Sequence, residues 1–138
     1  MSLYLCVLDT TSDTEFEGVE VGPYSYFAEV RELIRRSAEK VGIDLNKSVL
    51  LNHSDCSGVW ATSDLDDLEN EIRGLMAHFK VLQGRMISNL NWYVAWYLKS
   101  RPQTLHDSVV DVDGNPLLSR ICELIRVARE RCLPISFQ

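Results

Sequence analysis

Three stretches of the chain repeat apolar residues at three- and four-residue steps, which is the spacing of one face of an α-helix. The first begins at residue 25 or 26 and ends before Gly42, which favours the left-handed conformation that closes a helix. A fourth helix is predicted over 90–100, where Pro102 follows. The apolar positions of the three regular stretches are Phe27, Val30, Leu33, Ile34, Ala38 and Val41, then Leu65, Leu68, Ile72, Leu75, Met76 and Phe79, and last Leu117, Leu118, Ile121, Leu124, Ile125 and Ala128.

Capping residues indicate where two of these helices begin. Ser63 offers a hydroxyl as N-cap, and Asp66 stands three residues later in the capping-box position. Asn115 is the predicted N-cap of the last helix, with Pro116 as its first helical residue and the turn at Asp113–Gly114 leading into it.

Short apolar or alternating runs predict the strands. Residues 3–8 form an apolar run typical of a strand buried on both faces, and Val19 and Val21 alternate with a charged residue. Further strands are predicted over 48–52, 108–112 and 133–137. Because strands and helices are interleaved, we expect an α+β or α/β fold in which about four helices cover a small mixed sheet. The sequence shows no repeat or linker, so one domain over 1–138 is expected.

Composition narrows the class of protein. Hydrophobic residues make up 46% of the chain and the net charge is −6, which argues against a nucleic-acid partner because phosphates require clustered cations. No apolar run approaches the roughly 20 residues that cross a bilayer, and the start of the chain lacks a basic segment, so neither a membrane nor a secretion signal is expected. The four cysteines form no C-x-x-C pair, which favours reduced thiols in the cytoplasm.

The turn over 52–60 concentrates reactive side chains. His53, Asp55 and Cys56 lie within four residues, and Trp60 closes the turn. A nucleophilic thiol needs an imidazole within hydrogen-bond reach, but such pairs usually come from distant parts of a chain. The more ordinary interpretation is a polar turn whose side chains bond backbone amides.

A metal site is not predicted. The three histidines are scattered, and Asp111 to Asn115 resembles only the start of a calcium loop. Counted from Asp111, the sixth position is Pro116 instead of glycine and the twelfth is Cys122 instead of glutamate. We therefore expect neither a metal nor a cofactor.

Two groups of side chains suggest a binding surface. The second helix opens with more carboxylates than capping requires, although carboxylates near a helix N-terminus are themselves favourable. On the predicted helix over 90–100, Trp92 and Trp96 share a face that favours the core, whereas Tyr93 and Tyr97 suit either the core or an interface. The carboxylates are Asp64, Asp66, Asp67, Glu69 and Glu71.

Several segments together resemble a known family. They are 1–9, 17–22, 52–60, 110–114 and 133–138. In this order they resemble the bacterial immunity protein 70 family of polymorphic toxin systems, although 80–103 shows no such resemblance. The resemblance implies an intracellular protein that binds and neutralises a partner toxin, and it transfers no catalytic residue.

The leading hypothesis is therefore a cytoplasmic immunity protein that binds a cognate toxin with a basic face, as a monomer or a homodimer. One alternative is a small hydrolase or transferase that uses Cys56 or His53. Another is a structural or regulatory module that dimerises through the aromatic helix. The predicted contact residues are Asp55, Trp60, Asp64, Asp66 and Asp67, with Tyr93 and Tyr97 as aromatic anchors.

Overall fold

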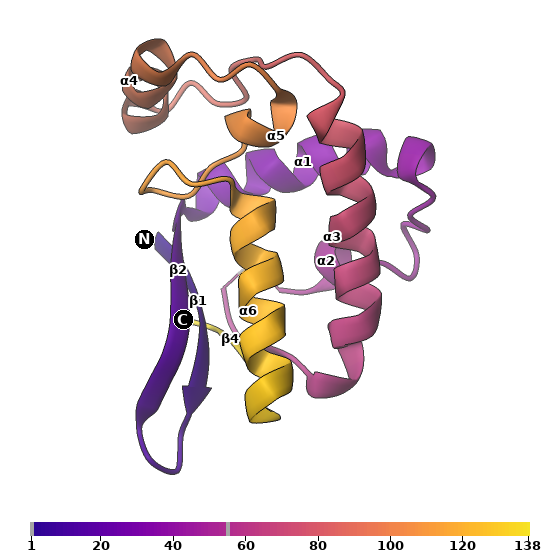
Figure 1. The fold of residues 1–138 in the computed structure, drawn as a ribbon, viewed down its shortest axis with the longest axis vertical. Helices are drawn as coiled ribbons and strands as arrows, with labels where there is room; N and C mark the ends of the chain where they lie inside the picture. Colours follow the sequence, from indigo (N-terminus) through magenta and orange to yellow (C-terminus); the bar gives the residue numbers. More distant parts are fainter. Residues whose placement is uncertain (1, 55) are drawn as a thin grey trace.

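A computed structural model, which describes residues 2–54 and 56–138, places a four-stranded sheet against a group of helices (Figure 1). The sheet has the spatial order β2-β1-β4-β3, and all of its pairings among the described residues are antiparallel. The predicted α+β class is confirmed, and the sheet is antiparallel instead of mixed. The strands are β1 (Ser2–Asp9), β2 (Thr14–Pro23), β3 (Val59–Trp60) and β4 (Ile135–Phe137).

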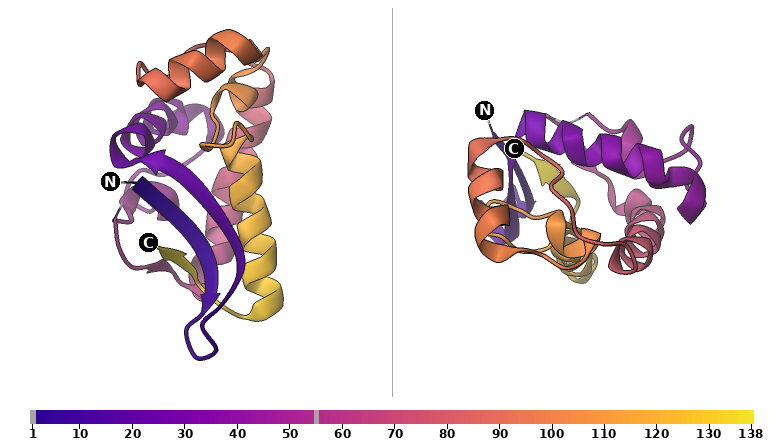
Figure 2. Two further views of the ribbon diagram at one scale, coloured as in Figure 1. Left: turned by 90° about the vertical axis from the view of Figure 1, so that its left-hand side faces the viewer. Right: turned by 90° about the horizontal axis from the view of Figure 1, so that it is seen from above.

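The three long helices lie on one side of the sheet (Figures 1 and 2). α3 and α6 run side by side, α1 packs against α3 and β2, and α4 lies at the end of the molecule away from the β1–β2 turn (Figures 1 and 2). No helix within the described residues is long and apolar enough to cross a membrane. The helices are α1 (Tyr24–Val41), α2 (Val49–Asn52), α3 (Leu65–Lys80), α4 (Asn91–Ser100), α5 (Leu105–Ser108) and α6 (Leu117–Arg131), with a 3-10 turn at Thr62–Asp64.

The predicted apolar faces form the core. Leu5 of β1, Ile72 of α3 and Leu124 of α6 are each 0% exposed. Burying a side chain of this size is favourable by about 1.5–3 kcal/mol, so the three long helices are held mainly by these faces. Gly42 ends α1 as predicted, with a φ of 76°, and Ile43 N donates to Ala38 O at 2.9 Å.

Two predicted helix starts are wrong. Asp64 is the N-cap of α3 and makes no side-chain capping bond, so neither the Ser63 cap nor the capping box of Asp66 is formed. α6 begins at Leu117 with Pro116 as its N-cap, one residue later than predicted. In both cases the residue predicted as the first of the helix is the N-cap instead: Asp64 ends the 3-10 turn before α3, and Pro116 precedes α6.

The strand predicted over 48–52 is the short helix α2. The side-chain oxygen of Ser48 accepts a hydrogen bond from Leu51 N at 3.0 Å, and Glu71 of α3 accepts one from Val49 N at 3.0 Å. These contacts satisfy amides at the helix N-terminus, which otherwise lack partners. A carboxylate more than 20 residues away therefore decides the conformation of a run that local propensity leaves ambiguous.

The strand predicted over 108–112 is also wrong, because α5 ends at Ser108 and an irregular segment follows. The buried hydroxyl of Tyr26 donates to Val110 O at 2.7 Å and accepts from Val110 N at 3.1 Å. Leu117 N donates to Val109 O at 2.8 Å. The backbone of this segment is thus satisfied by a side chain and by the start of α6 in place of a sheet.

Candidate functional site

The carboxylates at the start of α3 are divided between two sides of the helix. Asp66 and Glu69 face α6, where Arg129 donates to them at 2.6 and 2.7 Å. The pKa of Glu69 lies below its usual value because Arg129, and then Arg73, hydrogen-bonds to its carboxylate. This side of the acidic run is therefore neutralised within the molecule.

Asp64, Asp67 and Glu71 lie on the other side of α3. Glu71 accepts from the Ser48 hydroxyl at 2.6 Å and so caps α2. Within the described residues, Asp64 and Asp67 form no ion pair, and the side chain of Asp67 is exposed. Since residues three and four apart share a helix face, these acids form one stripe and Asp66 and Glu69 form another.

The stripe borders a surface hollow between α3 and the loop that joins α1 to α2. The hollow has a volume of about 390 Å³, and its lining includes three carboxylates and one lysine. Leu45, 45% exposed, lies on the same loop. We call this surface the acidic hollow. Its lining residues are Val41, Gly42, Ile43, Asp44, Lys47, Ser48, Asp67, Asn70 and Glu71.

Among the described residues of the turn over 52–60, no hydrogen bond joins the Cys56 thiol to the His53 imidazole. Nδ1 of His53 lies 2.6 Å from Ser54 O, and its Nε2 lies 2.8 Å from Val59 O. Both ring nitrogens therefore face backbone carbonyls. The Cys56 thiol lies 3.6 Å from the hydroxyl of Ser54. This geometry supports the interpretation of a structural turn.

The predicted contact residues of this turn have different positions. Trp60 is 0% exposed and packs edge-on against Phe137 at 4.7 Å, so its side chain belongs to the core and is not exposed as the contact prediction requires. Asp55 lies outside the described residues, and its contact with a partner stays a prediction.

On α4 the two tyrosines differ. Tyr93 is 0% exposed, and its hydroxyl donates to Ser108 O at 2.6 Å and accepts from Ile87 N at 3.4 Å. Of the two alternatives that the sequence left open for Tyr93, the structure has the core, because its ring and hydroxyl join α4 to the rest of the molecule. Tyr97 and Trp96 are half-buried. Tyr97 remains a candidate anchor.

A serine–histidine–aspartate row was not foreseen from the sequence. Nε2 of His106 lies 3.2 Å from the Ser119 hydroxyl, and its Nδ1 lies 3.2 Å from Asp107 Oδ1. His106 is only 5% exposed, so the ring is enclosed and the row joins α5 to α6. No sequence signal connects these residues, because Ser119 is 13 positions from His106.

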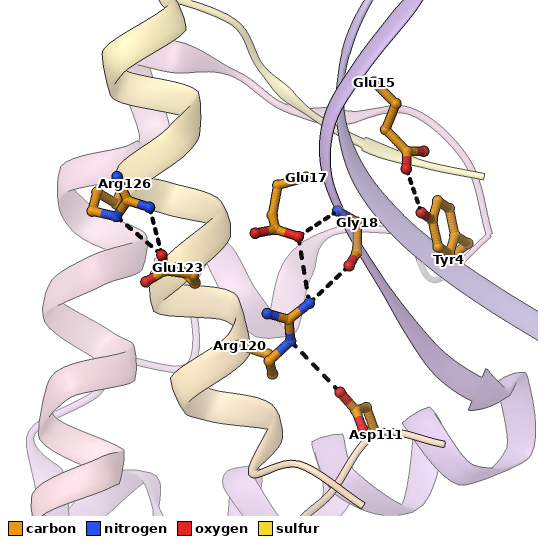
Figure 3. Close-up of polar contacts among 8 residues, drawn as sticks. All are labelled: Tyr4, Glu15, Glu17, Gly18, Asp111, Arg120, Glu123 and Arg126. Atoms are coloured by element: carbon orange, nitrogen blue, oxygen red, sulfur yellow. Dashed lines mark hydrogen bonds and ion pairs between the residues drawn. The ribbon is translucent and has the colours of Figure 1, made fainter. Parts of the chain in front are cut away.

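A second polar cluster connects α6 to β2 (Figure 3). Arg120 donates to Gly18 O at 2.9 Å, lies 3.5 Å from Glu17 and 3.8 Å from Asp111. Asp111 is 2% exposed, and burial raises the pKa of its carboxyl. Its Oδ1 accepts from the backbone amides of 113 and 115, so it orders the turn before α6. No group of three metal-ligating side chains occurs among residues 2–54 and 56–138.

The chain matches a known protein family. A family model described as immunity protein 70 matches residues 3–137 of the chain. No curated protein and no solved structure matches. The matched range includes residues 80–103, where the sequence motifs indicated no resemblance.

Proposed function

The chain belongs to the immunity protein 70 family, and from this we propose that it acts in the cytoplasm by binding a cognate toxin and blocking it. The acidic hollow and the adjoining Asp64 form the surface that meets a basic face of the toxin. The observation that carries this assignment is the division of the α3 carboxylates. Asp64 and Asp67 keep their charge unpaired among the described residues, whereas Asp66 and Glu69 are bound by Arg129.

The acidic hollow has the features of a recognition surface. Unpaired carboxylates raise the association rate with a cationic partner, because attraction acts before the two surfaces touch. The exposed Leu45 supplies an apolar side chain beside Asp44, and an apolar centre with a polar rim is the usual anatomy of an interface. Binding at such a surface inhibits by covering the toxin and requires no bond-making by this chain.

Asp66, Tyr97 and Asp55 remain predicted contacts of lesser weight. Asp66 is exposed but already pairs with Arg129, so a toxin would have to compete with that arginine. Tyr97 lies on α4, whereas the hollow is lined by α3 and by the end of α1 with the loop that follows it. A contact at Tyr97 would therefore require a second area of the interface.

The proposal is tested by co-expressing this chain with the toxin candidate, the product of the gene directly upstream of its own. The chain should restore growth and form a complex that can be isolated. Asp67→Lys should slow association by about tenfold or more at low salt, and the effect should shrink as salt is added.

Asp66→Lys is the matched control, because it makes the same change of charge one residue away on the same helix. It removes a surface ion pair worth about 0–1 kcal/mol and should alter toxin binding less than Asp67→Lys. The proposal fails if the unmodified chain neither restores growth nor binds the toxin. The assignment of the hollow fails if Asp67→Lys binds as fast as the unmodified chain.

A further inference from the structure

A second surface hollow, opposite in charge, lies between α1 and the segment that follows α3. Its volume is about 330 Å³. α1, α3, the segment after α3 and the start of α5 all contribute to its lining. We call it the basic groove. Its lining residues are Leu33, Arg36, Ser37, Lys40, His78, Leu82, Gln83, Arg85 and Leu105.

The groove is positively charged, although the net charge of the whole chain is negative. The whole sequence has 20 acidic and 14 basic residues, yet the described lining has Arg36, Lys40 and Arg85 and no carboxylate. Arg36 contacts Glu32 at 3.3 Å, but its side chain is 75% exposed, so this ion pair is weak and open to competition. A local excess of cations attracts carboxylates or phosphates.

The groove is also bordered by apolar side chains. Leu82 is 37% exposed, and Leu33 and Leu105 lie at the buried side. Free phosphate would make no favourable contact with these apolar side chains. A protein segment with acidic and apolar residues would contact both the cations and the apolar side chains of the groove. The mixed character therefore favours a protein segment as the occupant.

The segment that carries the exposed side chains is held in place by its backbone. Leu105 N donates to Leu82 O at 2.9 Å, Gly84 N donates to Gln103 O at 2.8 Å, and Arg85 N donates to the Ser108 hydroxyl at 3.2 Å. A Cβ on Gly84 would lie 2.1 Å from Pro102 O, so the close approach of these two backbones requires glycine. A preformed groove loses less entropy on binding than a loop that must first become ordered.

The basic groove and the acidic hollow lie on the two sides of one helix end. Lys40 lines the groove, the next residue Val41 lines the hollow, and Val41 packs near Gly74 of α3. Along α3, residues near 70 line the acidic hollow and His78 lines the basic groove. Gly74, where α1 meets α3, lies between them and separates the two surfaces. Surfaces of opposite charge therefore adjoin each other across the contact between the end of α1 and α3.

We propose that the basic groove binds an acidic, leucine-containing segment of the same toxin that the acidic hollow binds through its basic face. This inference rests on the proposed function. The paired charges fix the orientation of the toxin, because a rotated complex would place carboxylates against Asp67 and cations against Lys40. Repulsion of this kind excludes wrong orientations and wrong partners.

The test uses the full chain and short capped peptides in an NMR titration of backbone amides. A peptide of glutamate and leucine should shift the amides of 82–85 and 105, and its lysine and leucine counterpart should not. The double variant Lys40→Glu with Arg85→Glu should weaken binding of the glutamate peptide by about tenfold or more. Lys99→Glu on α4, a charge reversal at one position outside the groove, is the control and should leave binding of the glutamate peptide unchanged.

Three results would overturn the proposal. The first is a glutamate peptide that shows no preference for the groove or binds the double variant equally well. The second is inorganic phosphate that shifts the same amides at the same concentration, which would indicate a simple anion site. The third is a toxin complex that forms with the unmodified chain and is not weakened by the double variant. If the unmodified chain forms no toxin complex, the proposed function fails, and the peptide titration still decides whether the groove binds acidic segments.

Discussion

Removing the hydroxyl of Tyr26 should destabilise the protein strongly without changing its surface. Tyr26 is 0% exposed, and its hydroxyl makes two hydrogen bonds to the backbone of Val110, at 2.7 and 3.1 Å. Phenylalanine fills the same space, so Tyr26→Phe creates only a small cavity and isolates the loss of these bonds.

The expected magnitude follows from the two groups that lose their partner. A buried donor or acceptor left unsatisfied costs about 1–3 kcal/mol. Val110 would lose a partner for both its N–H and its C=O, and some relaxation of the irregular segment is expected. We therefore expect the free energy of unfolding to fall by about 2–4 kcal/mol, a large share of the typical total of about 5–15 kcal/mol.

Urea denaturation followed by tryptophan fluorescence measures this change. The midpoint should fall while the slope of free energy against urea stays the same. Tyr24→Phe, at a half-buried position two residues earlier, is the control and should change stability by no more than about 0.5 kcal/mol. If the two variants lose equal stability, the hydroxyl of Tyr26 does not hold the segment at Val110.

Two further predictions concern buried ionisable groups. Burial raises the pKa of Tyr93 to about 12, so between about pH 10 and 12 the unfolded chain loses this proton and the folded chain keeps it. The free energy of unfolding should therefore fall as pH rises, by up to about 1.4 kcal/mol per pH unit from this residue. In urea titrations above about pH 10, the difference in stability between the unmodified chain and Tyr93→Phe should shrink. A difference that stays constant would contradict this prediction. Asp111→Asn keeps an acceptor for the backbone amides of 113 and 115 and removes a buried charge, so it should change the free energy of unfolding by less than about 1 kcal/mol. Asp111→Ala removes the acceptor and should cost about 2 kcal/mol. Equal losses in thermal or urea unfolding would show that the acceptor is not what Asp111 contributes.

Periodicity was enough to locate the long elements. The stripes of α1, α3 and α6 depend on many apolar positions, and tertiary packing of those same positions stabilises each helix, so pattern and structure agree. The run over 48–52 is only five residues long, and Glu71, far away in sequence, satisfies the amides that make it helical. Short elements of this kind depend on contacts that no local pattern contains.

The candidate site was predictable in part. Helical spacing alone separates Asp67 from Asp66, because the two side chains point about 100° apart on a helix. The neutralisation of Asp66 could not be foreseen, because Arg129 lies 63 residues away in sequence. The burial of Tyr93 likewise depends on the carbonyl of Ser108, the last residue of α5, at a position where the sequence predicted the start of a strand.

The contacts at the outer edge of β2 have a consequence for how the protein behaves in a crowded cell. Two carbonyls on that edge are already occupied, since Arg120 donates to Gly18 O and Val112 N donates to Glu20 O. A strand from another molecule would need these acceptors to lengthen the sheet. These two contacts therefore disfavour the addition of another copy of the chain as a strand at this part of the hairpin.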